Sequence, residues 1–264
     1  MTSAVELALT SALEAEDDAA SSVLKALTLL AAVGSSEEPL GVTALARETG
    51  LPKSTAFRLL GLLVKRGLVE RCGSRYALGL QVFELGNRIA HCQPRSLRDI
   101  ALPRLVELYA STKCTAHLAI LDGLDVLYLE KIHGLDPVPS PSHVGGRVPA
   151  HCTALGKALL AFQPRTELAK FLSRRLRPLT GYTIVVPDLL ATELEGVRTA
   201  GYAIDREESC IGLTCVSAPV LDSSRRAVAA ISLSGRTTRL VPERLAPAIR
   251  RAAFDIARDV SRQP

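Results

Sequence analysis

Residues 42–63 hold two short helical patterns joined by a tight turn, and this segment constrains the fold more than any other. The first pattern places apolar residues at helical spacing, namely Val42, Leu45 and Ala46. Gly50 stands where this helix must stop, a place where a positive φ is often needed, and Pro52 suits the first position of the next helix. The inward face of that second helix is expected to consist of Ala56, Leu59, Leu60 and Leu63. The pattern predicts a helix-turn-helix.

The opposite face of the second helix is polar. It carries the hydroxyls of Ser54 and Thr55 and the guanidinium of Arg58, with Lys53 just before them. Such a face suits a DNA major groove, where hydroxyl and guanidinium groups read base edges. Phe57 fits two interpretations: it touches a thymine methyl, or it packs against the preceding helices. The segment therefore predicts sequence-specific binding of DNA.

A short basic hairpin follows the second helix. Residues 68–78 form two strand patterns around a Gly-Ser turn, which predicts the β wing of a winged helix. Within residues 51–76 the chain has one acidic residue and six basic ones, namely Lys53, Arg58, Lys65, Arg66, Arg71 and Arg75. Single cations are ordinarily solvated surface, but this concentration favours phosphate contact, chiefly by Lys53, Arg71 and Arg75.

The length of the chain, 264 residues, exceeds what such a unit needs and suggests two domains. Residues 1–20 contain five acidic residues and no basic one, and this segment is predicted to be disordered. The winged helix-turn-helix domain, mostly α-helical, is expected over 21–79. A linker helix over 80–94 then leads to a larger domain over 95–264.

Composition narrows the class of protein further. No apolar run approaches the roughly 20 residues that span a bilayer, and the N-terminus does not resemble a signal peptide. A cytoplasmic protein with no membrane partner is therefore expected. The six cysteines are dispersed without a Cys-x-x-Cys pair, so we expect reduced thiols, no zinc site and no cofactor.

The larger domain mixes helices with strands that read as antiparallel. Strands are expected over 115–121, 125–132, 201–205, 213–221 and 227–234. Helices are expected over 97–111, from about residue 153 onward, and over 165–172, 188–200 and 242–260. A long loop rich in proline, glycine and serine covers 134–149. These elements predict an α+β domain long enough to enclose a core.

This domain also carries residues suited to a small-molecule pocket. Ser232 and Ser234 share one strand face, Cys215 lies on a neighbouring apolar strand, and small residues open the helix near 153, where backbone N–H groups can approach an anion. The candidates are His117, Ala154, Leu155, Gly156, Cys215, Ser232 and Ser234. The alternative is purely structural: a capped, buried helix start, a core histidine, and serines exposed on one face of an ordinary antiparallel sheet.

Several motifs occur together in a fixed order. The first domain has Gly50-Leu51-Pro52-Lys53-Ser54-Thr55 with Arg58-Leu59-Leu60, then Tyr76-Ala77-Leu78-Gly79. The second has Val144-Gly145-Gly146-Arg147-Val148-Pro149 with His151, then Gly156-Lys157-Ala158-Leu159-Leu160-Ala161, Gly201-Tyr202-Ala203-Ile204-Asp205, Gly212-Leu213-Thr214-Cys215-Val216-Ser217-Ala218-Pro219-Val220 and Ile231-Ser232-Leu233-Ser234-Gly235. In this combination the chain resembles the isocitrate lyase regulator (IclR) family of bacterial transcription factors, from about residue 22 to 260.

The resemblance implies a winged helix-turn-helix joined by a linker helix to a GAF-like effector-binding domain, in dimers or dimers of dimers on palindromic or repeated operators. Positions that sense small carboxylates in the family match Asp205, Cys215, Ser232 and Ser234. Ala154 stands where such members have a glycine, which narrows the room near the anionic end of a ligand. The expected effector is a carboxylate or aromatic metabolite.

Two other classes of function compete with a regulator. In a cysteine-dependent enzyme with a DNA-binding appendage, Cys215 is the nucleophile and His151 or His117 its base, but the apolar surroundings of Cys215 disfavour a thiolate. A metal sensor would use histidines and cysteines that lack ligand-type spacing, namely His117, His133, His143 and His151. We therefore predict no catalytic and no metal-binding residue.

Overall fold

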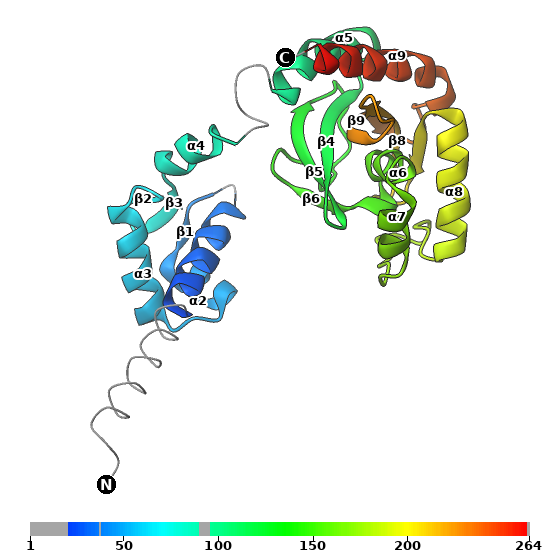
Figure 1. The fold of residues 1–264 in the computed structure, drawn as a ribbon. Coiled ribbons are helices and arrows are strands. Elements are labelled where there is room, and N and C mark those ends of the chain that lie inside the picture. The colour runs from blue at the N-terminus through cyan, green and yellow to red at the C-terminus, as the bar shows by residue number, and fades with distance from the viewer. Residues whose placement is uncertain (1–20, 37, 90–95, 263–264) are drawn as a thin grey trace. The chain divides into compact units, whose positions relative to one another are not determined.

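The computed structural model describes residues 21–36, 38–89 and 96–262. The expected disordered segment 1–20 lies outside the described residues. By its internal contacts the chain divides into two compact units, Met1–Ala90 and His91–Pro264, which are described separately (Figure 1).

The first unit is a helix-turn-helix followed by a hairpin. Its elements are a helix over 21–34, β1 (Leu40–Gly41), α2 (Val42–Thr49), α3 (Lys53–Lys65), β2 (Val69–Cys72), β3 (Arg75–Leu78) and α4 (Leu80–Gly86). The three strands form an antiparallel sheet in the order β1-β3-β2. The core beneath α3 consists of the predicted residues Ala56, Leu59, Leu60 and Leu63, which pack with Leu29, Leu45 and Val69.

The turn between α2 and α3 has the structure that the sequence predicts, except for the position of Pro52. Gly50 caps α2 with a φ of 68°, in the left-handed region that favours glycine. Pro52 precedes the helix instead of opening it, because α3 begins at Lys53. Its carbonyl accepts the N–H of Ala56 at 2.9 Å, which is the first hydrogen bond of the helix.

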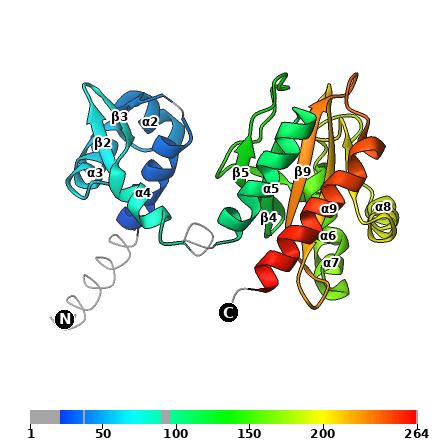
Figure 2. The same cartoon turned by 90° about the horizontal axis from the view of Figure 1, so that it is seen from above.

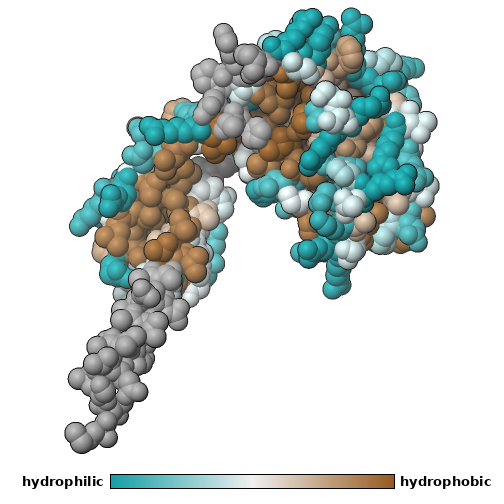
Figure 3. Space-filling model, viewed as in Figure 1, coloured by the Kyte–Doolittle hydropathy of each residue, from teal (hydrophilic) through white to brown (hydrophobic). Residues whose placement is uncertain are grey.

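The linker helix expected over 80–94 is shorter in the structure. α4 ends at Gly86, residues 87–89 form a turn, and 90–95 are outside the described residues. The side chains of α4 stay largely uncovered within the first unit: Leu80 is 77% exposed and Phe83 is 68% exposed. Figure 3 shows an apolar patch on this unit.

The second unit is one six-stranded antiparallel sheet covered by helices on both faces. Its strands are β4 (Thr115–Asp122), β5 (Asp125–Ile132), β6 (Arg147–Pro149), β7 (Ala203–Arg206), β8 (Leu213–Leu221) and β9 (Ala227–Arg236). Their order is β6-β5-β4-β9-β8-β7. The helices are α5 (Leu97–Thr112), α6 (Ala154–Ala161), α7 (Arg165–Leu172), α8 (Pro187–Ala200) and α9 (Pro242–Ser261), with a 3₁₀ turn η2 (Ala150–Cys152) before α6. The α+β prediction is confirmed, although the short β6 inside the expected loop was not foreseen.

Each face of the sheet has its own core. The helices α5 and α9 lie side by side on one face, where Leu105 and Ile249 meet strand residues such as Ile231 (Figure 2). On the other face α6 packs between the sheet and α8, and Leu159 and Leu190 belong to that core. Every residue of α6 is buried, because its residues apart from Lys157 are small or apolar. The start of this helix borders the site described below.

Candidate functional site

The outward face of α3 is open to solvent. Lys53, Ser54 and Arg58 are exposed, and Thr55 is half-buried. In the part of the chain that the structure describes, the side chains of Lys53 and Arg58 have no hydrogen bond or ion pair, so their donors are available to a ligand. Phe57 is 55% exposed, so part of its ring is open to solvent.

The hairpin β2–β3 presents two further arginines. Arg71 donates from Nε to the carbonyl of Gly73 at 2.9 Å, and Arg75 donates to the carbonyl of Pro39 at 3.4 Å. Both side chains are exposed. A guanidinium has five N–H donors, so each keeps donors for a further acceptor while one contact orients the side chain.

A cavity lies in the second unit between the sheet and the start of α6. Its lining residues come from all six strands of the sheet, the loop before β6, the helix start and the bend after β7. They are His117, Tyr128, Ser140, Pro141, Ser142, Val148, Thr153, Ala154, Leu155, Asp205, Ser209, Leu213, Cys215, Ser232 and Ser234. The free space is small, about 20 Å³ for the centre of a water-sized sphere, which is room for about one water molecule.

Strand register brings the sequence candidates together. Asp205 of β7 pairs with Cys215 of β8, which pairs with Ser234 of β9, so the three side chains form one row on one face. His117 of β4 pairs with Ser232 of β9 in the next row of that face. Both serines are buried, 1% and 5% exposed. The interpretation that they sit on an exposed sheet face is therefore wrong.

Gly156 is the candidate that does not border the cavity. Its N–H donates to Thr153 Oγ1 at 2.9 Å, which caps the helix. A Cβ added to Gly156 would lie 2.0 Å from the carbonyl oxygen of Ala150, so the residue allows α6 to pack against the 3₁₀ turn. Its neighbours Ala154 and Leu155 do line the cavity.

Asp205 is a fully buried carboxylate that lines the cavity. Its Oδ1 accepts the N–H groups of Glu208 at 2.7 Å and Ser209 at 3.4 Å, and its Oδ2 accepts the hydroxyl of Ser209 at 2.6 Å. Burial raises the pKa of Asp205 to about 6, although the hydrogen bond from Ser209 opposes the shift. The carboxylate is thus ionised at neutral pH but protonates more readily than an exposed one.

His117 lines the same cavity and lies between two serines. Its Nδ1 is 3.2 Å from Ser232 Oγ and its Nε2 is 3.1 Å from Ser142 Oγ. Its ring stands edge-on to Tyr128, with centroids 5.3 Å apart. Burial lowers the pKa of His117 to about 3, and nearby Lys131 adds to the shift, so the imidazole is neutral at pH 7.

Lys131 was missed by the sequence analysis. It pairs with His117 across β4 and β5, and its Nζ donates to the carbonyl of Ser142 at 2.5 Å and to the hydroxyl of Ser142 at 3.1 Å. Nothing in the sequence distinguished it from a surface lysine. The register of the two strands, which sequence does not give, places Lys131 beside His117, and its ammonium contacts Ser142, which lines the cavity.

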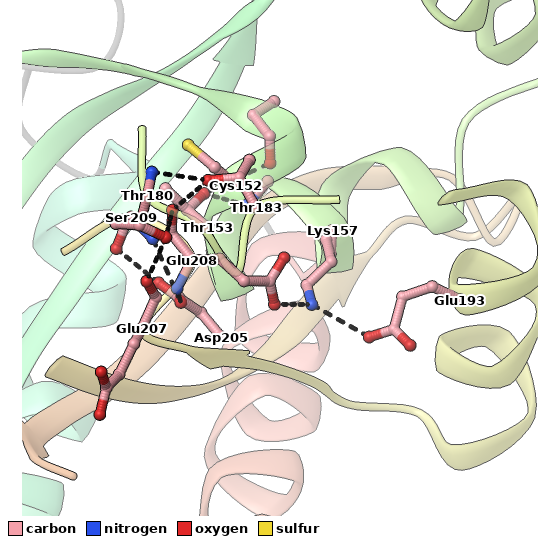
Figure 4. A network of polar contacts seen from close by, with 12 residues as sticks. Cys152, Thr153, Lys157, Thr180, Thr183, Glu193, Asp205, Glu207, Glu208 and Ser209 are labelled. Carbon is pink, nitrogen blue, oxygen red and sulfur yellow. Dashed lines mark hydrogen bonds and ion pairs between the residues drawn. The ribbon is translucent and has the colours of Figure 1, made fainter. Parts of the chain in front are cut away.

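Lys157 of α6 is a buried lysine that lies between Glu208 and Glu193 (Figure 4). It is 1% exposed and donates to Glu208 at 2.6 Å and to Glu193 of α8 at 3.0 Å. Burial raises the pKa of Glu208, while the Lys157 ammonium acts in the opposite direction. The backbone N–H of Glu208 also donates to the carboxylate of Asp205. The ion pair with Lys157 therefore fixes Glu208, which in turn helps to hold the Asp205 carboxylate in place.

The surroundings of Cys215 do not activate a nucleophile. Burial raises the pKa of its thiol, and the nearby Asp205 carboxylate raises that pKa further. Both ring nitrogens of His117 contact serines, and His151 contacts the carbonyl of Arg177 at 3.0 Å. Among the described residues, no group of three His, Cys, Asp or Glu side chains lies close enough to hold a metal ion. No helix in the described ranges is both long and apolar enough to cross a membrane.

The sequence matches known proteins along nearly its whole length. The family described as "Bacterial transcriptional regulator IclR C-terminal" matches residues 90–262, and the "IclR helix-turn-helix domain" matches residues 22–73. The HTH-type transcriptional regulator KdgR of Escherichia coli is 35% identical over 241 residues, 88% of this chain and 89% of KdgR.

Two solved structures resemble the fold. The IclR protein of Thermotoga maritima has a TM-score of 0.77 at 32% identity, covering 90% of this chain and 98% of that one. An IclR homologue from Microbacterium hydrocarbonoxydans in complex with 4-hydroxybenzoate has a TM-score of 0.79 at 26% identity, covering 90% and 100%. The chain therefore belongs to the IclR family of transcriptional regulators, with a helix-turn-helix DNA-binding domain and a C-terminal effector-binding domain.

Proposed function

We propose that this protein binds specific operator DNA through α3 and the β2–β3 hairpin, and that a small organic effector in the cavity of the second unit alters this binding. The effector is a carboxylate or aromatic metabolite. The observation that carries the proposal is the cavity itself, which buries an Asp, a His and several Ser side chains at one site. Burying polar groups costs free energy, and binding a ligand that hydrogen-bonds to them would explain why they are gathered at one buried site.

On DNA, the side chains of α3 take two roles. Ser54, Thr55 and Arg58 approach base edges, and the exposed Phe57 ring contacts a thymine methyl. Lys53 contacts phosphate in the proposal, and so do the two hairpin residues Arg71 and Arg75. This division follows from position, because the outward face of a recognition helix meets the groove whereas the wing runs beside the backbone.

In the effector domain, the proposed contacts are the residues that border the cavity. They are His117, Ala154, Leu155, Asp205, Cys215, Ser232 and Ser234. The structural relative that holds 4-hydroxybenzoate supports a small organic acid or aromatic compound as the ligand class. Gly156 supports the site indirectly, since it lets the helix start pack closely against the 3₁₀ turn.

The active form in this proposal is a homodimer or a dimer of dimers on a palindromic or repeated operator. The exposed apolar side chains of α4 support a contact between copies of the chain, because a solvated helix rarely displays residues such as Leu80 and Phe83 together. The effector would change the relative orientation of the paired DNA-binding domains through the segment that follows α4.

The test uses the intergenic DNA beside the gene for this protein. A footprint on that DNA is expected to protect a palindrome or repeat, which then serves as the probe for a metabolite screen. A compound that shifts the operator affinity of the wild type is expected to lose its effect in Asp205→Asn, and to keep it in the matched surface variant Asp188→Asn. Equal effects of the compound on both variants would refute the assignment of the cavity as the effector site.

A further inference from the structure

One wall of the cavity in the second unit is a single irregular segment. Ser140, Pro141 and Ser142 border the cavity, and Pro141 is at the same time exposed to solvent. This part of the chain therefore has the cavity on one side and water on the other. We call the segment, residues 137–144, the strap. It contains neither helix nor strand.

The strap is fastened at both ends. Just before it, the carboxylate of Asp136 accepts hydrogen bonds from Arg236 at 2.9 Å and from Arg239 at 2.9 Å. Just after it, the N–H of Gly145 donates to the carbonyl of Tyr128 at 2.8 Å. Gly145 has a φ of 80°, in the left-handed region that favours glycine, so the chain turns sharply where the strap ends. These contacts fix both ends and leave the middle to be held separately.

The middle of the strap makes few backbone contacts. Within the described residues, the one backbone–backbone hydrogen bond of 137–144 runs from the N–H of Gly146 to the carbonyl of His143, inside a turn. Proline occupies positions 137, 139 and 141, which therefore have no N–H to donate. The strap can thus leave the cavity without breaking a ladder of backbone hydrogen bonds.

Lys131 of β5 makes the strongest contact to the strap. Its ammonium donates to the Ser142 carbonyl at 2.5 Å and to the Ser142 hydroxyl at 3.1 Å. His117 Nε2 lies 3.1 Å from the same hydroxyl, and the thiol of Cys210 contacts the carbonyl of Pro139 at 3.4 Å. Hydrogen bonds from a charged donor are stronger than those between neutral groups, and a thiol is a weak donor. Removing the ammonium should therefore loosen the strap most.

The other walls of the cavity are held more firmly. The sheet lies between two helical layers, each with its own core, and α6 is buried along its whole length. The bend after β7 is fixed by hydrogen bonds on both sides (Figure 4). The hydroxyl of Thr183 donates to the carbonyl of Glu208 at 2.6 Å, and the N–H of Glu208 donates to Asp205 at 2.7 Å. The strap is the wall that withdraws at the lowest cost.

We infer that the strap is the gate of the cavity and that Lys131 holds it closed. The inference rests on the proposed effector function, because it names the route by which an effector reaches its site. The free space admits about one water molecule, so a larger ligand enters only when part of the lining withdraws. Opening is local: residues 137–144 move while the sheet and α6 stay folded.

The test measures opening by the alkylation of Cys215, which borders the cavity. The full chain is treated with iodoacetamide under native conditions, and mass spectrometry follows each cysteine separately. Cys72 is exposed in the first unit and reports the reactivity of the reagent. Cys152 is 0% exposed and does not border the cavity, so it reports unfolding of the whole second unit.

Lys131→Met is expected to accelerate the labelling of Cys215 about tenfold or more, as the loss of a charge-assisted hydrogen bond implies. The labelling rates of Cys72 and Cys152 should stay unchanged. Lys170→Met, which removes an exposed lysine of α7, is the matched control and should change none of the three rates.

Pro139→Cys tests the gate in the opposite direction. The new thiol is placed near Cys210, which contacts the carbonyl of residue 139, and oxidation can join the two. With the link verified by peptide mapping, Cys215 should be labelled at least about tenfold more slowly, and reduction with dithiothreitol should restore the rate. If the link does not form, the comparison of Lys131→Met with the wild type decides.

Three results would overturn the inference. Cys215 could react in Lys131→Met at the wild-type rate. Cys152 could accelerate by the same factor as Cys215, which would assign the exposure to unfolding of the whole unit. The linked Pro139→Cys protein could be labelled at Cys215 as fast as its reduced form.

Operator binding of the same preparations separates this inference from the proposed function. The labelling experiment needs neither DNA nor an effector, so the gate can fail while specific operator binding persists. If the wild type shows no specific operator binding, the proposed function fails, and the labelling result still decides whether the strap opens.

Discussion

Replacing Lys157 by methionine measures how much of the stability of the effector domain depends on one buried ion pair. Methionine keeps the length of the side chain and removes its charge. Of the two carboxylates left behind, that of Glu193 is 38% exposed and can regain water. That of Glu208 is 8% exposed, so the variant must either bury an unpaired charge or protonate Glu208.

The structure sets the magnitude of the loss. An uncompensated buried charge costs about 3–5 kcal/mol. Protonating Glu208 instead costs about 1.36 kcal/mol for each pH unit above its ordinary pKa of 4.5, which is about 3.4 kcal/mol at pH 7. The cheaper route prevails, so we expect Lys157→Met to lower the free energy of unfolding by about 3 kcal/mol at pH 7.

The sign of the pH dependence follows from the same argument. In the variant, burial without the ammonium raises the pKa of Glu208 further, so the folded chain holds a proton that the unfolded chain releases above its ordinary pKa. Stability is then lost as the pH rises, and the penalty should shrink to about 1.4 kcal/mol at pH 5.5.

The assay is denaturant unfolding of the full chain at pH 5.5 and pH 7, followed by circular dichroism. Lys170→Met removes an exposed lysine from a surface pair and should change stability by less than about 0.5 kcal/mol. Adding Glu208→Gln to Lys157→Met removes the stranded carboxylate and should recover part of the loss. A loss below about 1 kcal/mol at pH 7, or an equal loss at both pH values, would refute the reasoning.

Three further predictions follow from packing and burial. Gly156→Ala should abolish the cooperative unfolding transition of the second unit in a thermal scan, because its Cβ meets the Ala150 carbonyl oxygen at 2.0 Å. Gly196→Ala, in a helix position with open space, should instead stabilise the chain by about 0.5–1 kcal/mol in the same scan; a loss of stability would contradict this. Alkylation of the native chain should label the exposed Cys72 well before Cys215, because burial raises the pKa of the Cys215 thiol. Equal rates of labelling, measured by mass spectrometry, would contradict the burial of Cys215.

Much of the fold could be predicted because local signals were strong. The helices α2 and α3 have clear apolar periodicity and a glycine that the turn requires, and β8 and β9 are apolar runs bounded by turn residues. The strand β6 could not be predicted, since its three residues become a strand only through pairing with β5. The end of α4 at Gly86 was missed for a related reason: the apolar residues of the sequence keep helical spacing past Gly86, so the pattern does not mark where the helix ends.

The site was predictable in its residue types but not in its geometry. Ser232 and Ser234 alternate on one face in the sequence, yet only the pairing with β4 and β8 decides that this face is buried. Lys131 reads as surface because its ammonium contacts Ser142, in the irregular loop after β5, whose path the sequence does not give. Lys157 did carry a signal, a single lysine among the small and apolar residues of α6, which indicates a buried charge in need of a partner.

The most direct test of the proposed operator recognition by α3 is the affinity of the Arg58→Ala variant for DNA. This affinity is measured for the footprinted operator and for a scrambled duplex, over a range of salt concentrations. We predict a loss of about 1–3 kcal/mol on the operator and little change on the scrambled duplex. Lys53→Ala should weaken binding to both DNAs alike and reduce the slope of log affinity against log salt by about one. Unchanged operator affinity in Arg58→Ala at matched salt would contradict the claim that α3 reads the operator.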